Sequence, residues 1–144
     1  MAEAKTVLNA IHAALNRRDA EAATGFFADD ATMVCPEGVF KGKNEIKRYF
    51  TWVLGTWPQL KLSDAGIGVI VEGNMATHEY VSEGTSTRGS KGKVACVATC
   101  ELSDGKVMRL NVYYDRLSIA DQAATGFMER RFVTQIVQQM ECGL

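Results

Sequence analysis

An acidic residue at the end of a strand-like segment is the first candidate for chemistry in this sequence. Residues 106–115 alternate as a β-strand does, follow the turn at Asp104-Gly105, and end at Asp115. An acid at the mouth of a sheet is where enzymes acting on small molecules often keep a proton carrier. We therefore predict Asp115 as a catalytic acid or base.

The same alternation supports a second interpretation of Asp115. The apolar face of this strand, which should look inward, consists of Met108, Leu110, Val112 and Tyr114. Asp115 belongs to the opposite face, where it would be a surface carboxylate or a partner for Arg109 or Arg116. Only a bulge or the strand end near Tyr114 would turn it inward.

Two histidines are the next candidates. His78 shares a face of its predicted strand with Tyr80, so a proton carrier and a phenol would lie side by side if that face lines a pocket. Otherwise His78 is an exposed histidine or one satisfied inside the protein. His12, on a predicted helix, either lines the pocket or lies at the helix boundary without a task. The other predicted substrate-binding residues are Tyr114, Phe50, Trp57 and Cys35.

Helical spacing and strand alternation indicate the elements that must position these residues. Helices are predicted over 4–16, from Asp19 through Phe27, from a cap at Asn44 to Leu54, and over 128–140, the last expected to dock on the body. Strands are predicted over 31–35, 60–72, 75–87, 93–102 and 106–115. Short turns join the last four strands, which favours antiparallel pairing. The fold class is α+β.

Composition limits the classes of protein to consider. The 144 residues are 47% hydrophobic, which fits one domain over 1–144, with a core at about 4–120 and a C-terminal helix at about 124–141. The 16 basic and 17 acidic residues are scattered, so nucleic acid is not an expected partner. No apolar run is long enough for a bilayer and no secretory signal is recognisable, so we expect a cytoplasmic protein without a membrane partner.

Cofactor and metal motifs are missing from the sequence. It has no phosphate loop and no glycine-rich dinucleotide motif in the required context, and its two histidines lie far apart without a ligand pattern. Cys35, Cys96, Cys100 and Cys142 form no metal-binding pattern and are expected to be reduced, structural thiols. Any chemistry is therefore expected to need no cofactor and no metal.

Four segments in a fixed order carry a family resemblance: Ala28-Asp-Asp-Ala-Thr32, Gly42-Lys-Asn-Glu-Ile46, Gly84-Thr85, and Asp104-Gly-Lys-Val107 leading to Tyr113-Tyr-Asp115. Over residues 4–120 the chain resembles the nuclear transport factor 2-like superfamily, and within it the SnoaL-like polyketide cyclase branch. The resemblance implies a cone formed by a curved antiparallel sheet wrapped on helices, an apolar pocket inside it, and frequent homodimers.

The resemblance also implies which residues act in catalysis, and it argues against two activities, those of ketosteroid isomerases and of limonene epoxide hydrolases. Ketosteroid isomerases have an aspartate base where this chain has Cys35, and limonene epoxide hydrolases have an aspartate where it has Val112. SnoaL-like cyclases have their acid/base aspartate at the end of the last strand, where this chain has Asp115.

The expected function follows from that match. We expect a cyclase or isomerase of a small apolar carbonyl compound, with His78 or Tyr80 polarising the substrate. A dehydratase or hydrolase using the same pocket, and a non-catalytic binding or dimerisation module, remain open.

Overall fold

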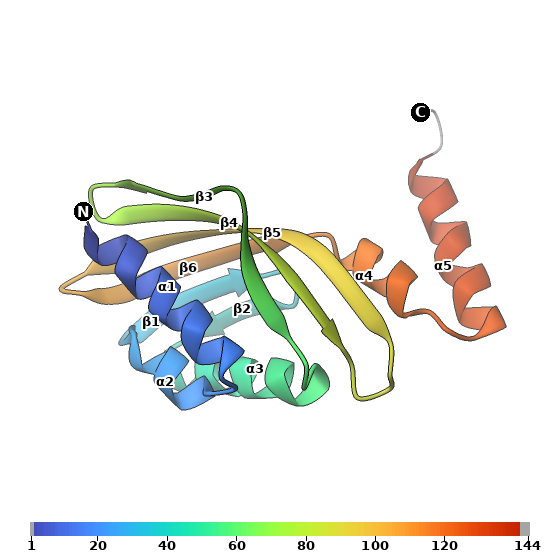
Figure 1. Cartoon of the computed structure of the whole chain (residues 1–144), viewed down its shortest axis with the longest axis horizontal. Coiled ribbons are helices and arrows are strands. Elements are labelled where there is room, and N and C mark those ends of the chain that lie inside the picture. Colours follow the sequence, from blue (N-terminus) through green and yellow to red (C-terminus); the bar gives the residue numbers. More distant parts are fainter. Residues whose placement is uncertain (1, 142–144) are drawn as a thin grey trace.

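One curved sheet with helices on one side forms the body of the molecule (Figure 1). The computed structural model describes residues 2–141. Its helices are α1 (Ala2–Asn16), α2 (Ala20–Gly25), α3 (Lys43–Thr56), α4 (Arg116–Ala123) and α5 (Phe127–Met140). Its strands are β1 (Phe27–Cys35), β2 (Gly38–Lys41), β3 (Lys61–Glu72), β4 (Met75–Thr85), β5 (Lys91–Ser103) and β6 (Lys106–Tyr114). The sheet order is β2-β1-β6-β5-β4-β3, so the α+β class is confirmed.

In the sheet the first strand of the chain lies beside the last strand. β1 pairs with β6 in parallel, with Met33 opposite Leu110, whereas all other neighbouring strands are antiparallel. Both residues are buried. The largest fully buried side chains include Phe27 on β1, Leu8 on α1 and Ile46 on α3, so the core lies between the sheet and the first three helices.

Helix α1 covers the sheet with its apolar stripe, as the spacing predicts. Leu8, Ile11 and Leu15 are buried on this stripe. The C-terminal end of the helix is fixed to β3 by Asn16, whose side chain donates to the Leu62 carbonyl (3.0 Å) and accepts from the Leu62 amide (2.8 Å). These two hydrogen bonds hold the C-terminal end of α1 against β3.

Strand β3 contains a bulge that resets its register. Asp64 pairs with Tyr80 of β4, but the next regular pair is Val69 with His78. Gly66 has a positive φ of 53°, and the neighbouring Ile67 amide donates to the Glu79 carboxylate at 3.1 Å. Residues before and after the bulge can therefore both turn side chains toward the helices.

Helix α2 ends earlier than the sequence predicts. Asp19 caps α2 as expected, accepting from the Ala22 amide at 2.8 Å. However, α2 ends at Gly25, and Phe27 begins β1 rather than belonging to the helix. Phe27 has helical spacing in the sequence, but it pairs with β6 in the sheet, and no local pattern reveals this pairing.

Two short elements were not predicted, and one helix cap was assigned wrongly. β2 pairs with β1 in a hairpin, and α4 follows β6 directly. The N-cap of α3 is Gly42, not Asn44, and no side chain caps this helix. Instead, the Glu45 carboxylate accepts from the Lys41 amide at 2.7 Å.

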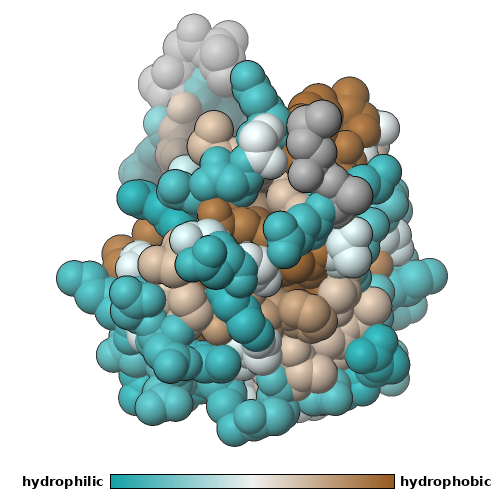
Figure 2. Space-filling model, turned by 90° about the vertical axis from the view of Figure 1, so that its left-hand side faces the viewer, coloured by the Kyte–Doolittle hydropathy of each residue, from teal (hydrophilic) through white to brown (hydrophobic). Residues whose placement is uncertain are grey.

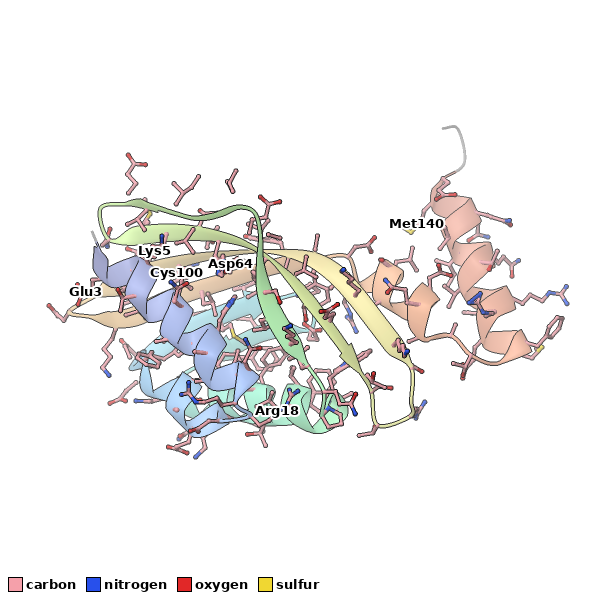
Figure 3. All side chains as sticks on the ribbon, in the orientation of Figure 1. Glu3, Lys5, Arg18, Asp64, Cys100 and Met140 are labelled. Atoms are coloured by element: carbon pink, nitrogen blue, oxygen red, sulfur yellow. The ribbon has the colours of Figure 1, made fainter. Side chains whose placement is uncertain are left out.

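Helix α5 lies apart from the body (Figure 1). The expectation that it docks is wrong, because none of its residues is buried and its neighbour in the fold is α4. Its exposed apolar side chains are Phe127, Met128, Phe132, Ile136 and Met140, the last labelled at the far end of the helix in Figure 3.

Within residues 2–141 no helix is long and apolar enough to span a membrane. A cytoplasmic location stays a prediction.

The three cysteines in the described range are free and buried: Cys35, Cys96 and Cys100. Burial raises the pKa of the Cys100 thiol to about 11, so this thiol is protonated at neutral pH. Cys142 lies outside the described residues.

Candidate functional site

A cavity of about 340 Å³ lies between the sheet and the helices. Its floor is apolar and deeply buried, formed by Leu8 and Ile11 of α1, Met33 of β1, Ala98 of β5 and Leu110 of β6. The exposed Trp52 of α3 and the exposed Arg116 and Ala120 of α4 also line it. The cavity therefore opens between α3 and α4, and it is large enough for a small organic molecule.

Five of the eight predicted site residues line this cavity: His12, Phe50, Trp57, Tyr80 and Tyr114. They come from α1, from α3 and its C-cap Trp57, from β4 and from β6, so the fold brings together side chains that lie far apart in the sequence. Two further predicted residues, Cys35 and His78, are buried but are not among the lining residues. His78 lies behind His12, with the two ring centroids 4.5 Å apart.

Asp115 is exposed and does not line the cavity. β6 ends at Tyr114, and Asp115 is the N-cap of α4, where its Oδ1 accepts from the amides of Leu117 (2.9 Å) and Ser118 (3.2 Å). Its carboxylate thus has a structural task in this conformation.

Glu37 is a cavity carboxylate that the sequence analysis did not select. It lies in the turn between β1 and β2 and lines the cavity, half-buried. Its Oε2 accepts a hydrogen bond from the Tyr49 hydroxyl at 3.2 Å. One signal in the sequence could have identified Glu37. Related isomerases have their base at the position of Cys35, and Glu37 lies two residues after it.

The groups around Glu37 are held in their protonated forms. Burial, and then the negative charges of neighbouring groups including Glu37, raise the pKa of Tyr49 far above its usual value. Burial likewise raises the pKa of the Cys35 thiol, and its interaction with Glu37 adds to this. Glu37 is therefore surrounded by hydrogen-bond donors rather than by other anions.

Tyr80 and Cys96 form a second polar group on the cavity wall. Burial raises the pKa of Tyr80 well above its usual value, and interactions with Cys96, Cys35 and Glu37 add to this effect. The pKa of Cys96 is raised to about 11, again mainly by burial. Since Glu37, Tyr49, Tyr80 and Cys96 all line the same cavity, the two polar groups belong to one site.

Charged groups also lie along the remaining wall. Glu83 lines the cavity, and its carboxylate lies 3.9 Å from Lys93 Nζ. Arg116 donates to the Pro36 carbonyl at 3.2 Å, next to Glu37. Among the described lining residues, Glu37 and Glu83 are the carboxylates and Arg116 is the cation.

Metal binding finds no support in the described part of the chain, since no group of three or more His, Cys, Asp or Glu residues there could hold an ion. What the cavity can do chemically is acid/base work, because the carboxylates of Glu37 and Glu83, the protonated phenols of Tyr49 and Tyr80 and the imidazole of His12 line an apolar space.

The sequence matches a known family. Residues 8–110 match the model of the SnoaL-like domain. No curated protein matches the chain.

Similar solved structures share the fold at low sequence identity. TerC co-crystallised with polyporic acid is 21% identical over 85% of this chain and 99% of that one, with a TM-score of 0.75. A protein described as a SnoaL-like polyketide cyclase, from Jannaschia sp. CCS1, is 12% identical over 87% and 94%, with a TM-score of 0.77. A protein of ketosteroid isomerase-like fold from Catenulispora acidiphila DSM 44928, in complex with trimethylamine, is 18% identical over 83% and 93%, with a TM-score of 0.75.

Proposed function

The chain belongs to the SnoaL-like domain family of the nuclear transport factor 2-like superfamily, and from this premise we propose that its cavity binds a small apolar carbonyl compound and exchanges protons with it. The reaction class is a cofactor-independent cyclisation or isomerisation. The observation that carries the proposal is the convergence of Glu37, Tyr49, Tyr80 and His12 on one apolar cavity. Similar structures with bound polyporic acid or trimethylamine support a small-molecule ligand.

Glu37 and Tyr80 have definite places in such a reaction. Glu37 removes a proton from the carbon next to the carbonyl, and an enolate forms. The protonated hydroxyl of Tyr80 donates to the enolate oxygen and limits its negative charge. Return of the proton from Glu37 to a different carbon completes an isomerisation. In a ring closure the enolate carbon instead attacks a second carbonyl, and the alkoxide formed there takes the proton back from Glu37.

Proton abstraction can be tested without the natural substrate. We expect the protein to accelerate exchange of the α-protons of 2-tetralone, a small apolar ketone, in D₂O buffer. The loss of the α-proton signals is followed by ¹H NMR, with heat-unfolded protein and buffer as controls. An exchange rate equal to that in buffer would contradict the proposal.

A binding module without chemistry is the second candidate. It is favoured by the position of Asp115, which caps α4 and is exposed instead of lining the cavity. In that case 2-tetralone shifts the protein's amide signals but exchanges its α-protons no faster than in buffer. A dehydratase or hydrolase would use the same cavity, and the loss or gain of water in the product distinguishes it.

A second copy of the chain is the proposed macromolecular partner. Strands β3 to β6 expose Ile70, Met75, Val97 and Tyr113 on the side away from the helices, with Val97 directly opposite Tyr113. Figure 2 shows apolar side chains among the hydrophilic ones on the end of the molecule that it views. Contact between two such outer faces would bury these side chains.

The dimer can be tested by sedimentation. We expect twice the chain mass of 15.7 kDa, and the monomer mass for Tyr113→Glu, since a buried charge opposes the contact. Ile136→Glu on α5 is the matched control and should stay dimeric. A monomeric wild-type chain would refute the proposal.

A further inference from the structure

The proposed base, Glu37, stands on a short turn whose backbone is held from several sides. Pro36 and Glu37 alone join β1 to β2, and the hairpin closes with the pair Cys35 and Gly38. The proline ring fixes its own φ at about −65°. From α4, Arg116 donates to the Pro36 carbonyl at 3.2 Å. The freedom that remains to the carboxylate therefore lies in the side-chain torsions of Glu37.

Tyr49 of α3 restricts that remaining freedom. Its hydroxyl donates to Glu37 Oε2 at 3.2 Å, and both side chains line the cavity. Burial is the main cause that keeps the pKa of Tyr49 far above its usual value, so the hydroxyl retains the proton that it donates. Since a carboxylate has two oxygens, a bond at Oε2 leaves Oε1 to accept a proton from a ligand.

The ring of Tyr49 is itself held by packing. Its centroid lies 4.7 Å from that of Phe40 on β2, 6.0 Å from that of Phe50 and 5.9 Å from that of Trp52. Helix α3 is fixed in the core through Ile46 and Phe50, both buried. A hydroxyl on a ring held in this way keeps one position, which is what a group that supports a catalytic side chain must do.

A hydrogen bond to a carboxylate has two opposite effects on its work as a base. It orients the accepting oxygen toward the ligand, which speeds proton removal. It also stabilises the ionised form, which makes the carboxylate a weaker base. Orientation is the larger effect for a long side chain on the cavity wall, because a misplacement of about 1 Å can cost about 10²-fold in rate.

We infer that Tyr49 is the positioning residue of Glu37: it holds Oε2 and thereby presents Oε1 to the ligand. The α-proton of the ligand moves to Oε1 and returns to the ligand from there, while the Tyr49 proton stays on its own oxygen. The inference deepens the proposed function and rests on it for the assignment of Glu37 as the base.

Tyr49→Phe tests the inference, because it keeps the ring and its packing but removes the hydroxyl. We expect kcat for exchange of the α-protons of 2-tetralone in D₂O to fall by about 10–10²-fold, with KM changed by less than about twofold. Loosening of the cavity wall alone would raise KM instead. An unchanged or higher kcat would overturn the inference, because the hydrogen bond would then only weaken the base.

Tyr113→Phe is the matched control. Of the four tyrosines in the sequence, Tyr49, Tyr80 and Tyr114 line the cavity, whereas Tyr113 is 56% exposed on the outer face of β6. Removal of its hydroxyl should leave kcat and KM unchanged. Denaturant unfolding of both variants checks that each is folded.

A second variant shows whether Tyr49 acts through Glu37, and it leaves the aromatic packing intact. Glu37→Asp keeps the carboxylate but withdraws it by one methylene from the Tyr49 hydroxyl, so kcat should fall. Adding Tyr49→Phe to this variant should slow exchange by no more than about twofold further, because the contact is already lost. A further tenfold loss would overturn the inference, since the two residues would then act independently.

The wild-type rate separates the inference from the proposed function. Acceleration over buffer that is equal in wild type and in Tyr49→Phe would refute the inference alone. A wild-type rate equal to that in buffer would refute the proposed function, and with it the inference, because no base would remain for Tyr49 to position.

Discussion

Exchange of ketone α-protons is expected to slow by about 10²–10⁴-fold in Glu37→Gln, the range typical for loss of a general base. The amide has nearly the shape of the carboxylate and can still accept from the Tyr49 hydroxyl, so the turn between β1 and β2 should keep its structure. The measurement is the 2-tetralone exchange rate at saturating ketone, with circular dichroism as the check on folding.

Two matched variants make this result specific. Glu83→Gln changes the other carboxylate of the cavity wall, and we expect it to retain most of the exchange activity. Asp115→Asn preserves the cap of α4, because asparagine is as good an N-cap as aspartate, and should also retain activity. Loss of exchange in Asp115→Asn with full activity in Glu37→Gln would reverse the assignment and support the catalytic role predicted for Asp115.

Replacing Phe27 with alanine is expected to lower the free energy of unfolding by about 3–5 kcal/mol. Phe27 is 0% exposed, opens β1, and packs edge-on against Phe50 with ring centroids 5.9 Å apart. Because Phe50 lines the cavity, the hole left behind it should also loosen the cavity wall. Denaturant unfolding measures the effect, and a chain of this size has only about 5–15 kcal/mol in total.

Phe127→Ala is the control for this prediction. Phe127 is 78% exposed at the start of α5, so its removal should change the free energy of unfolding by no more than about 0.5 kcal/mol. Similar effects of the two variants would contradict the assignment of Phe27 to the core of the domain.

The sequence predicts the fold well where a pattern is local. Alternation along the last strand correctly makes Leu110, Val112 and Tyr114 its inner face, and all three line the cavity. The prediction is wrong for Met108, because the register of β6 against β5 shifts before Arg109, and Val107 is the fully buried residue there. Along β4, His78 and Tyr80 share the buried face as predicted. These results follow from the period of two in a strand, which needs no knowledge of partners.

The sequence predicts the site less well because its polar groups depend on nonlocal geometry. Glu37 faces the cavity only because β2 folds back on β1 and α3 brings Tyr49 to the carboxylate. The hydrogen bond between the His78 ring and the Asp64 carboxylate depends on a bulge that alternation does not reveal. Asp115 could have been recognised as a helix cap, but Arg116–Ala123 has no buried residue and no apolar stripe to indicate a helix.

The parallel pairing of β1 with β6 has a consequence for how the protein is made. Met33 and Leu110, opposite one another on the cavity floor, are separated by about half of the chain. On the ribosome β1 can pair only with β2 until β6 has been synthesised, and closing such a long loop slows folding. The cavity is therefore among the last features to form, and a nascent chain that ends before β6 cannot bind a ligand in it.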